Sequence, residues 1–173
     1  MSSLFNHIFI PVVILLLFSK NLKLNSREVA ALSFFAVLPD LDFFFAQIEP
    51  IPLHRALFHN VFMLVIPLLL FIIAKSRREV FGIICFYLTS HFILDLFTGG
   101  IFLFYPVYNN VFFVNIELLF NFKPVIEYGI SNEIMNMGRG EPVISSENVA
   151  IALILITFFT ISVHEIYRKT KSK

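Results

Sequence analysis

Long apolar runs separated by short polar connections make up most of the chain. Because an α-helix rises about 1.5 Å per residue, about 20 mostly apolar residues cross a hydrocarbon core about 30 Å thick. Five runs reach or approach that length, namely residues 4–18, 29–48, 53–74, 80–105 and 149–163. The pattern predicts an all-α fold, an integral membrane helical bundle of about five spans that forms a single transmembrane domain over residues 1–173.

The composition excludes a soluble domain. The 173 residues are 58% hydrophobic and 14% charged, whereas soluble domains average about 45–50% apolar and about 25% charged residues. Thirteen Lys and Arg against twelve Asp and Glu leave a net charge of +1, which provides no basic surface for a nucleic acid. The single cysteine, Cys85, lies in an apolar run and indicates no redox compartment.

Basic residues predict the orientation of the spans. They form three clusters, which alternate with connections poor in Lys and Arg: Lys20, Lys23 and Arg27; Lys75, Arg77 and Arg78; Arg168, Lys169, Lys171 and Lys173. Basic clusters mark cytoplasmic ends, so we expect a multi-pass protein of the plasma (inner) membrane with its N-terminus outside and its C-terminus in the cytoplasm. No Lys or Arg precedes the first run, which favours a retained span over a cleaved signal peptide.

The longest connection, residues 107–148, is then an extracytoplasmic loop. Its segment 111–122 is rich in Phe, Val and Leu but is interrupted by polar residues. Such a segment favours a helix lying in the membrane interface, and a buried strand is the alternative. Residues 129–146 contain glycines and a proline and are predicted to be irregular.

The apolar runs also contain ionisable residues. An Asp at the bilayer centre costs about 2.5–3.5 kcal/mol on insertion scales, so each such residue indicates a functional or structural role that offsets this cost. Every Asp and four of the five His lie within or at the ends of apolar runs: His7, Asp40, Asp42, His54, His59, His91 and Asp95. The fifth, His164, stands beside Glu165 and is predicted to be an ordinary interfacial histidine.

The strongest of these motifs is SHFILDLFTGG, residues 90–100. His91 and Asp95 are four positions apart and therefore share one helical face, which Thr98 continues. An imidazole and a carboxylate one turn apart can bind a divalent metal. The alternative is a hydrogen-bonded pair that only holds two helices together.

The motif LPDLD, residues 38–42, carries two acids. Pro39 is expected to end or kink the helix. Asp40 and Asp42 would point about 200° apart on a helix but the same way in an extended stretch, so a break lets them converge. The alternative is a surface turn with solvated acids.

The motif HRALFHN, residues 54–60, is predicted to lie in the first turns of a helix that opens at Pro52. His54 and His59 are candidate ligands, and Arg55 near a helix N-terminus suits an anionic group such as phosphate. The alternative for Arg55 is a side chain that snorkels to lipid headgroups. His7 is the weakest candidate, with a packing or interfacial role as the alternative.

The predicted depths of these motifs in the membrane are similar. At about 1.5 Å per residue, His91 and Asp95 lie about 20 and 26 Å from Arg78, beyond the midplane of the membrane. The predicted orientation brings the other candidates to the outer ends of their spans. The sequence therefore predicts one polar site, and a metal site, in the outward-facing half of the bundle.

The order and spacing of LPDLD, HRALFHN and SHFILDLFTGG, followed by Tyr105-Pro106, resemble the predicted membrane-bound metal-dependent hydrolases of the YdjM type over about the first 106 residues. That family commonly shows Gly, Thr and Ser where this chain has Ala56, Phe58 and Asn60. The family is distantly similar to the zinc-dependent phospholipase C superfamily, onto which only His91 and Asp95 map.

Together the residues and the resemblance imply a hydrolase that acts on a phosphoester or other ester, with a membrane lipid as a candidate substrate. The metal ligands would be His7, Asp40, Asp42, His54, His59, His91 and Asp95. Arg55 would hold a phosphoryl group and Thr98 would hydrogen-bond a ligand. Mixed His and carboxylate ligands suit zinc first, then manganese or iron. A transporter or channel, or a non-catalytic, metal-stabilised assembly protein, are the alternatives. Membrane lipids are the expected partners, with no nucleic acid and the oligomeric state left open.

Overall fold

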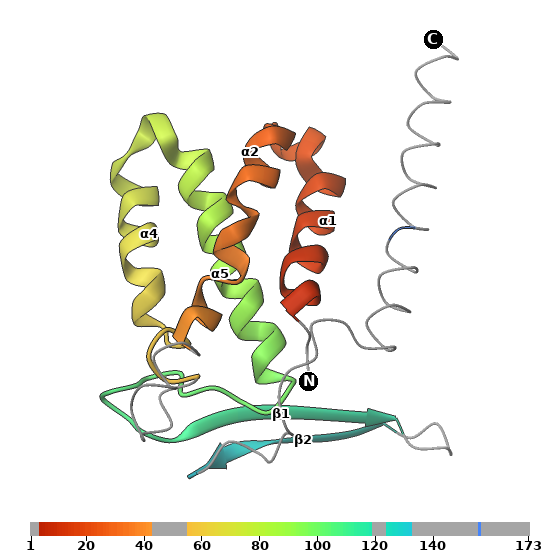
Figure 1. Ribbon diagram of the computed structural model, residues 1–173, viewed down its shortest axis with the longest axis vertical. Helices are drawn as coiled ribbons and strands as arrows, with labels where there is room; N and C mark the ends of the chain where they lie inside the picture. Colours follow the sequence, from red (N-terminus) through yellow and green to blue (C-terminus); the bar gives the residue numbers. More distant parts are fainter. Residues whose placement is uncertain (1–3, 43–54, 119–123, 133–155, 157–173) are drawn as a thin grey trace.

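The computed structural model describes residues 4–42, 55–118, 124–132 and 156. This part of the chain is mostly helical, with one small two-stranded sheet. The helices lie side by side, and the sheet lies across one end of the bundle (Figure 1). The elements are α1 (Leu4–Leu22), α2 (Ser26–Ala31), η1 (Leu32–Ala36), η2 (Pro39–Leu41), α4 (Phe62–Ile73), η3 (Lys75–Arg77), α5 (Arg78–Leu96), β1 (Val111–Leu118) and β2 (Pro124–Ser131).

Within the described residues, two helical stretches are long and apolar enough to cross a membrane. They are α1, with 19 residues, and Lys75–Leu96, with 22 residues, or about 29 and 33 Å at 1.5 Å per residue. They correspond to the first and fourth predicted runs. Helix α4 has 12 residues and is about 18 Å long, too short to cross alone. The predicted fifth run, apart from Ile156, lies outside the described residues.

The second predicted run is not one helix. Helix α2 starts at Ser26, where the Asn25 side chain caps it by accepting the Arg27 N–H at 3.0 Å. The chain continues as η1, leaves helical geometry at Val37 and resumes as η2 with Pro39 in its first turn. Proline suits that position because its missing N–H has no helical partner there. The predicted break at Pro39 is confirmed.

The third predicted run begins as an irregular segment instead of a helix. Over residues 55–61 no helix forms, and Arg55 has a left-handed backbone with φ of 65°. The Val61 N–H donates to the Leu103 carbonyl at 2.9 Å, and the Phe102 N–H donates to the Arg55 carbonyl at 3.2 Å. Hydrogen bonds to the chain after α5 therefore hold this segment, and the predicted helical turn around Arg55 and His59 is wrong.

The segment after α5 forms a hairpin. Strand β1 pairs antiparallel with β2, with Val111 opposite Ser131. The interfacial helix predicted over 111–122 is therefore wrong for residues 111–118, where the strand alternative is correct. Gly100 lets the hairpin approach closely: its φ is +93°, and an added Cβ would lie 2.5 Å from Val111 Cγ1. Ile101 bridges to Phe112 beside this contact.

The buried core lies between α1, α2, η1 and α5. Its fully packed members are Leu15, Val29, Ala36, Ile83 and Tyr87. The Tyr87 hydroxyl donates to the Val29 carbonyl at 2.6 Å, which satisfies a polar group inside this core. Helix α4 instead exposes a broad apolar surface, with Ile66, Ile72 and Ile73 each more than 60% exposed. Such a surface suits hydrocarbon better than water.

Candidate metal centre

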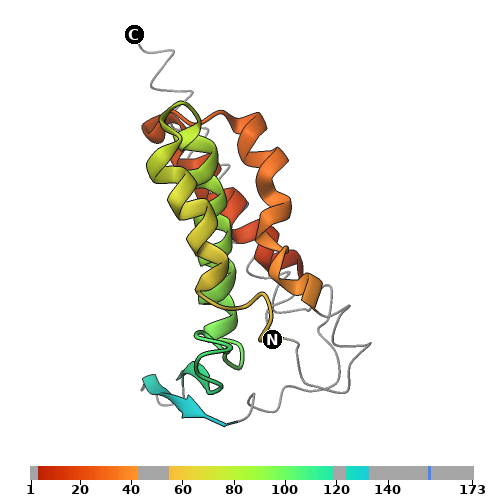
Figure 2. The ribbon, with the colours of Figure 1, turned by 90° about the vertical axis from the view of Figure 1, so that its left-hand side faces the viewer.

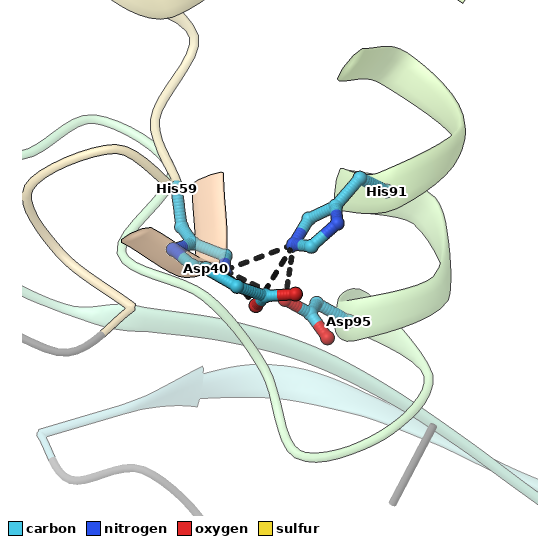
Figure 3. A group of neighbouring side chains, drawn as sticks. All are labelled: Asp40, His59, His91 and Asp95. Atoms are coloured by element: carbon cyan, nitrogen blue, oxygen red, sulfur yellow. Dashed lines mark hydrogen bonds and ion pairs between the residues drawn. The ribbon is translucent and has the colours of Figure 1, made fainter. Parts of the chain in front are cut away.

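Four ionisable side chains from three parts of the chain meet at the end of the bundle beside the sheet. Asp40 comes from η2, His59 from the irregular segment, and His91 and Asp95 from α5. One ligand atom of each lies within 4.8 Å of all the others (Figure 3). His59, His91 and Asp95 are 0–1% exposed, so water does not screen their charges.

The hydrogen bonds of the two imidazoles assign their tautomers. His91 Nδ1 lies 2.6 Å from the Ala36 carbonyl oxygen, which accepts hydrogen bonds only, so Nδ1 carries the proton. His59 Nδ1 lies 2.8 Å from Asp42 Oδ2 and donates to that carboxylate in the same way. In the neutral form of each ring, Nε2 then keeps its lone pair. Both Nε2 atoms are therefore available as ligands.

The two lone pairs face each other and two carboxylates. The Nε2 atoms of His59 and His91 are 3.0 Å apart. Asp95 Oδ2 lies 3.0 Å from His59 Nε2 and 3.2 Å from His91 Nε2, and Asp40 Oδ1 lies 3.4 and 3.5 Å from the same atoms. With both rings neutral, these are four acceptor atoms that face one another, and a shared cation, either a proton or a metal ion, would relieve their mutual repulsion. This donor set of two imidazoles and two carboxylates fits a divalent metal ion.

Both carboxylate oxygens of Asp95 contact polar side chains. Its Oδ2 faces the two imidazoles, while its Oδ1 lies 3.4 Å from His7 Nε2, 3.5 Å from Arg55 Nη2 and 3.4 Å from the Thr98 hydroxyl. The predicted sharing of one helical face by His91 and Asp95 is confirmed by their contact one turn apart on α5, and Thr98 reaches Asp95 from the turn that follows the helix.

Asp42 lies behind His59. Its Oδ2 accepts from His59 Nδ1 and also from the Arg55 backbone N–H at 2.9 Å. Asp40 and Asp42 therefore contact opposite nitrogens of the same imidazole ring, and Asp42 is not one of the four clustered ligand atoms. A carboxylate behind a ligating histidine orients the ring and raises its basicity.

Arg55 is buried, with 2% of its surface exposed. Besides its contact with Asp95, its Nη1 donates to the Thr98 carbonyl at 3.3 Å and to the Gly100 carbonyl at 3.4 Å. It therefore does not snorkel to the surface. Its guanidinium joins the irregular segment to the end of α5.

The remaining predicted site residues divide into two groups. His7 on α1 stacks on the His91 ring at 4.0 Å between centroids and is fully buried, but it is not one of the four clustered ligand residues. His54 lies outside the described residues, as does His164, which was not predicted to belong to the site. The Ala36 carbonyl, which orients His91, carried no signal in the sequence because every residue has a carbonyl.

The model of the YdjM inner membrane protein family matches residues 1–169. The chain belongs to the YdjM inner membrane protein family. Comparisons with curated proteins and with solved structures return no match. The resemblance inferred from the first 106 residues is thus confirmed, and the match also includes the C-terminal part of the chain.

One departure from the common YdjM motif has a clear structural effect. Asn60, where a Ser is common, accepts the Phe62 N–H at 3.1 Å and donates to the carbonyls of Ala56 and Leu57. Its amide thus closes the turn that contains His59, just before α4 begins.

Proposed function

We propose that this protein is a membrane-bound, metal-dependent hydrolase that acts on a phosphoester or another ester from the outer side of the membrane. The observation that carries the proposal is the buried set of four mutually facing acceptors, Asp40, His59, His91 and Asp95. Zinc is the first candidate, with manganese and iron as alternatives, because two imidazoles and two carboxylates suit these ions.

The side chains around the four ligands would give the site its rigidity. The Ala36 carbonyl and Asp42 hold the two imidazole rings by their Nδ1 atoms. Arg55 and Thr98 contact the Asp95 oxygen that does not face the rings. A bound divalent ion would supply Lewis-acid activation of water near neutral pH. Arg55, fixed beside this site, would add positive charge for an anionic oxygen of the substrate.

The placement in the membrane is part of the proposal. Helices α1 and α5 run along the bundle, so their basic ends, at Lys20 and Arg78, lie at the end opposite the sheet (Figures 1 and 2). Basic ends face the cytoplasm, which would put the metal centre on the outer side in a bundle of about five spans. A substrate that arrives from the membrane, a lipid first of all, would reach this side.

One observation favours a second candidate, a metal-stabilised assembly protein without catalytic activity. The Arg55 guanidinium contacts Asp95 and two backbone carbonyls, which are contacts that build structure. Under this alternative the metal would hold α5, η2 and the irregular segment together, and substitutions of ligands would affect stability alone.

The test uses the full-length chain purified in detergent. Zinc, manganese and iron would be measured by mass spectrometry, and hydrolysis would be followed on a panel of nitrophenyl phosphoesters, carboxylic esters and phospholipids. The hydrolase predicts turnover that a chelator abolishes and a divalent ion restores. Stoichiometric metal without turnover on the whole panel favours the assembly protein. Solute flux in sealed vesicles without turnover in detergent favours a transporter or channel.

A further inference from the structure

A cavity of about 720 Å³ lies at the end of the bundle opposite the metal centre. It is lined by α1, α2 and the connection between them, and by α4, η3 and the first turns of α5. Its volume is in the range of small-molecule sites, which is about 300–1,000 Å³. Asp95 follows Arg78 by 17 positions of helix, or about 26 Å, so this cavity is separate from the proposed hydrolytic site.

One part of the cavity lining is charged. Lys75, Arg77 and Arg78 supply three cations, and Glu28 and Glu79 supply two carboxylates. Arg78 is held in place by the Phe71 ring, with its guanidinium carbon 4.5 Å from the ring centroid. The cations outnumber the acids, so the lining favours an anion that also offers hydroxyl groups to the two carboxylates.

The other part of the lining is apolar. Leu15, Leu22, Phe71, Ile83 and Phe86 line it, from three helices. A free inorganic anion gains no stabilisation from an apolar wall, whereas an acyl chain is stabilised by each CH₂ group that it buries there. Charged and apolar linings in one cavity therefore match a molecule with an anionic head and a hydrocarbon tail.

The position of the cavity in the membrane agrees with this chemistry. The basic residues of η3 stand at the end of a helical stretch long enough to span the bilayer. In the proposed orientation this end lies on the cytoplasmic side at the height of lipid headgroups, and basic pockets between transmembrane helices on that side bind anionic headgroups.

We propose that this cavity binds an anionic phospholipid of the inner leaflet. The phosphodiester would pair with Lys75, Arg77 and Arg78, headgroup hydroxyls would donate to Glu28 or Glu79, and one acyl chain would lie along α1 and α5. The bound lipid would fill the space between α1 and α4 and so stabilise the bundle.

The experiment measures lipid binding to the full-length protein by native mass spectrometry and by the shift of its unfolding temperature. The probes are phosphatidylglycerol and phosphatidylcholine with the same acyl chains. We expect phosphatidylglycerol to bind at least about tenfold more tightly, and the triple variant K75Q/R77Q/R78Q to lose that preference. The matched control is K20Q/K23Q/R27Q, which removes the same charge from the same end of the bundle but from residues that do not line the cavity.

A second pair of variants tests the apolar wall at constant charge. Leu22 lines the cavity and is 56% exposed, so Leu22→Trp would fill the space without disturbing the core. It should weaken lipid binding, whereas Phe18→Trp, at an exposed position on α1 that does not line the cavity, should not. Equal losses in the two charge variants, equal binding of the two lipids, or displacement of the lipid by millimolar inorganic phosphate would each overturn the proposal.

Discussion

The Nε2 atoms of His59 and His91 lie 3.0 Å apart, although 32 positions separate the two residues. Each ring donates its other nitrogen to a fixed acceptor, Asp42 or the Ala36 carbonyl, so the two lone pairs point at each other. Such an arrangement is stable when a cation lies between the nitrogens. The predictions below test this relationship and its surroundings.

Loss of a proposed ligand should remove the metal. We expect His91→Ala and Asp95→Ala to lose most of the bound metal and to unfold at lower temperature, because a ligand bound only by the native state stabilises that state by about 2.7 kcal/mol at 100 times its dissociation constant. The controls are His164→Ala and Tyr87→Phe. Tyr87 lies one turn before His91, but its hydroxyl donates to the Val29 carbonyl in the core and does not contact the metal centre. Equal metal content in all four variants would refute the assignment.

Substitution of Asp42 should lower the affinity for the metal without changing the number of metal ions bound. Asp42→Asn keeps the size of the side chain but weakens the hold on His59 Nδ1, and loss of an outer partner costs about 10–100-fold in metal affinity. We therefore expect the variant to bind a full equivalent at high metal concentration and to release it to a weaker chelator than the wild type does. Complete loss of metal at every concentration would make Asp42 a ligand.

Arg55 distinguishes the hydrolase from the assembly protein. Lys keeps the charge of Arg55 but lacks the planar fork that grips two oxygens. For a hydrolase we expect Arg55→Lys to lower kcat by at least about tenfold while metal content and unfolding temperature stay close to those of the wild type. A fall in unfolding temperature with no activity to lose would support the structural role of its contacts to Thr98 and Gly100.

Gly100 should be required for packing of the hairpin against the bundle. An added Cβ would lie 2.5 Å from Val111 Cγ1 and 2.6 Å from the Phe112 carbonyl oxygen, at a φ of +93°. We expect Gly100→Ala to cost about 1–3 kcal/mol in unfolding free energy. Gly129→Ala is the comparison, because its Cβ would meet only the end of the Phe113 ring, at 3.2 Å. The unfolding temperatures of both variants are measured in the same detergent. Equal losses of stability in Gly100→Ala and Gly129→Ala would contradict the packing argument.

The orientation can be tested by labelling single cysteines from outside the cell. In a Cys85→Ser background, a cysteine near Lys23 should stay unlabelled and one near Gly138 should react, because the basic clusters are expected in the cytoplasm. Labelling near Lys23 would reverse the topology, and the metal centre would then face the cytoplasm.

Local sequence determined the parts of the site that depend on neighbouring residues. The spacing of four between His91 and Asp95 brings both to one face of any helix, and Pro39 interrupts the helix wherever it stands. The apolar runs determined two helical stretches of spanning length, since length and hydropathy are properties of the segment itself. The motif order also identified the YdjM family.

Tertiary structure decided what depends on distant partners. The segment 55–61 is not helical because its backbone bonds to residues 102 and 103, and residues 111–118 form a strand because β2 and Ile101 pair with them. Asp40 and Asp42 contact the two different nitrogens of His59, where local geometry alone allowed them to converge as equals. For the segment 55–61, hydrogen bonds to residues more than 40 positions away outweigh local helix preference, and no short window of sequence contains both partners.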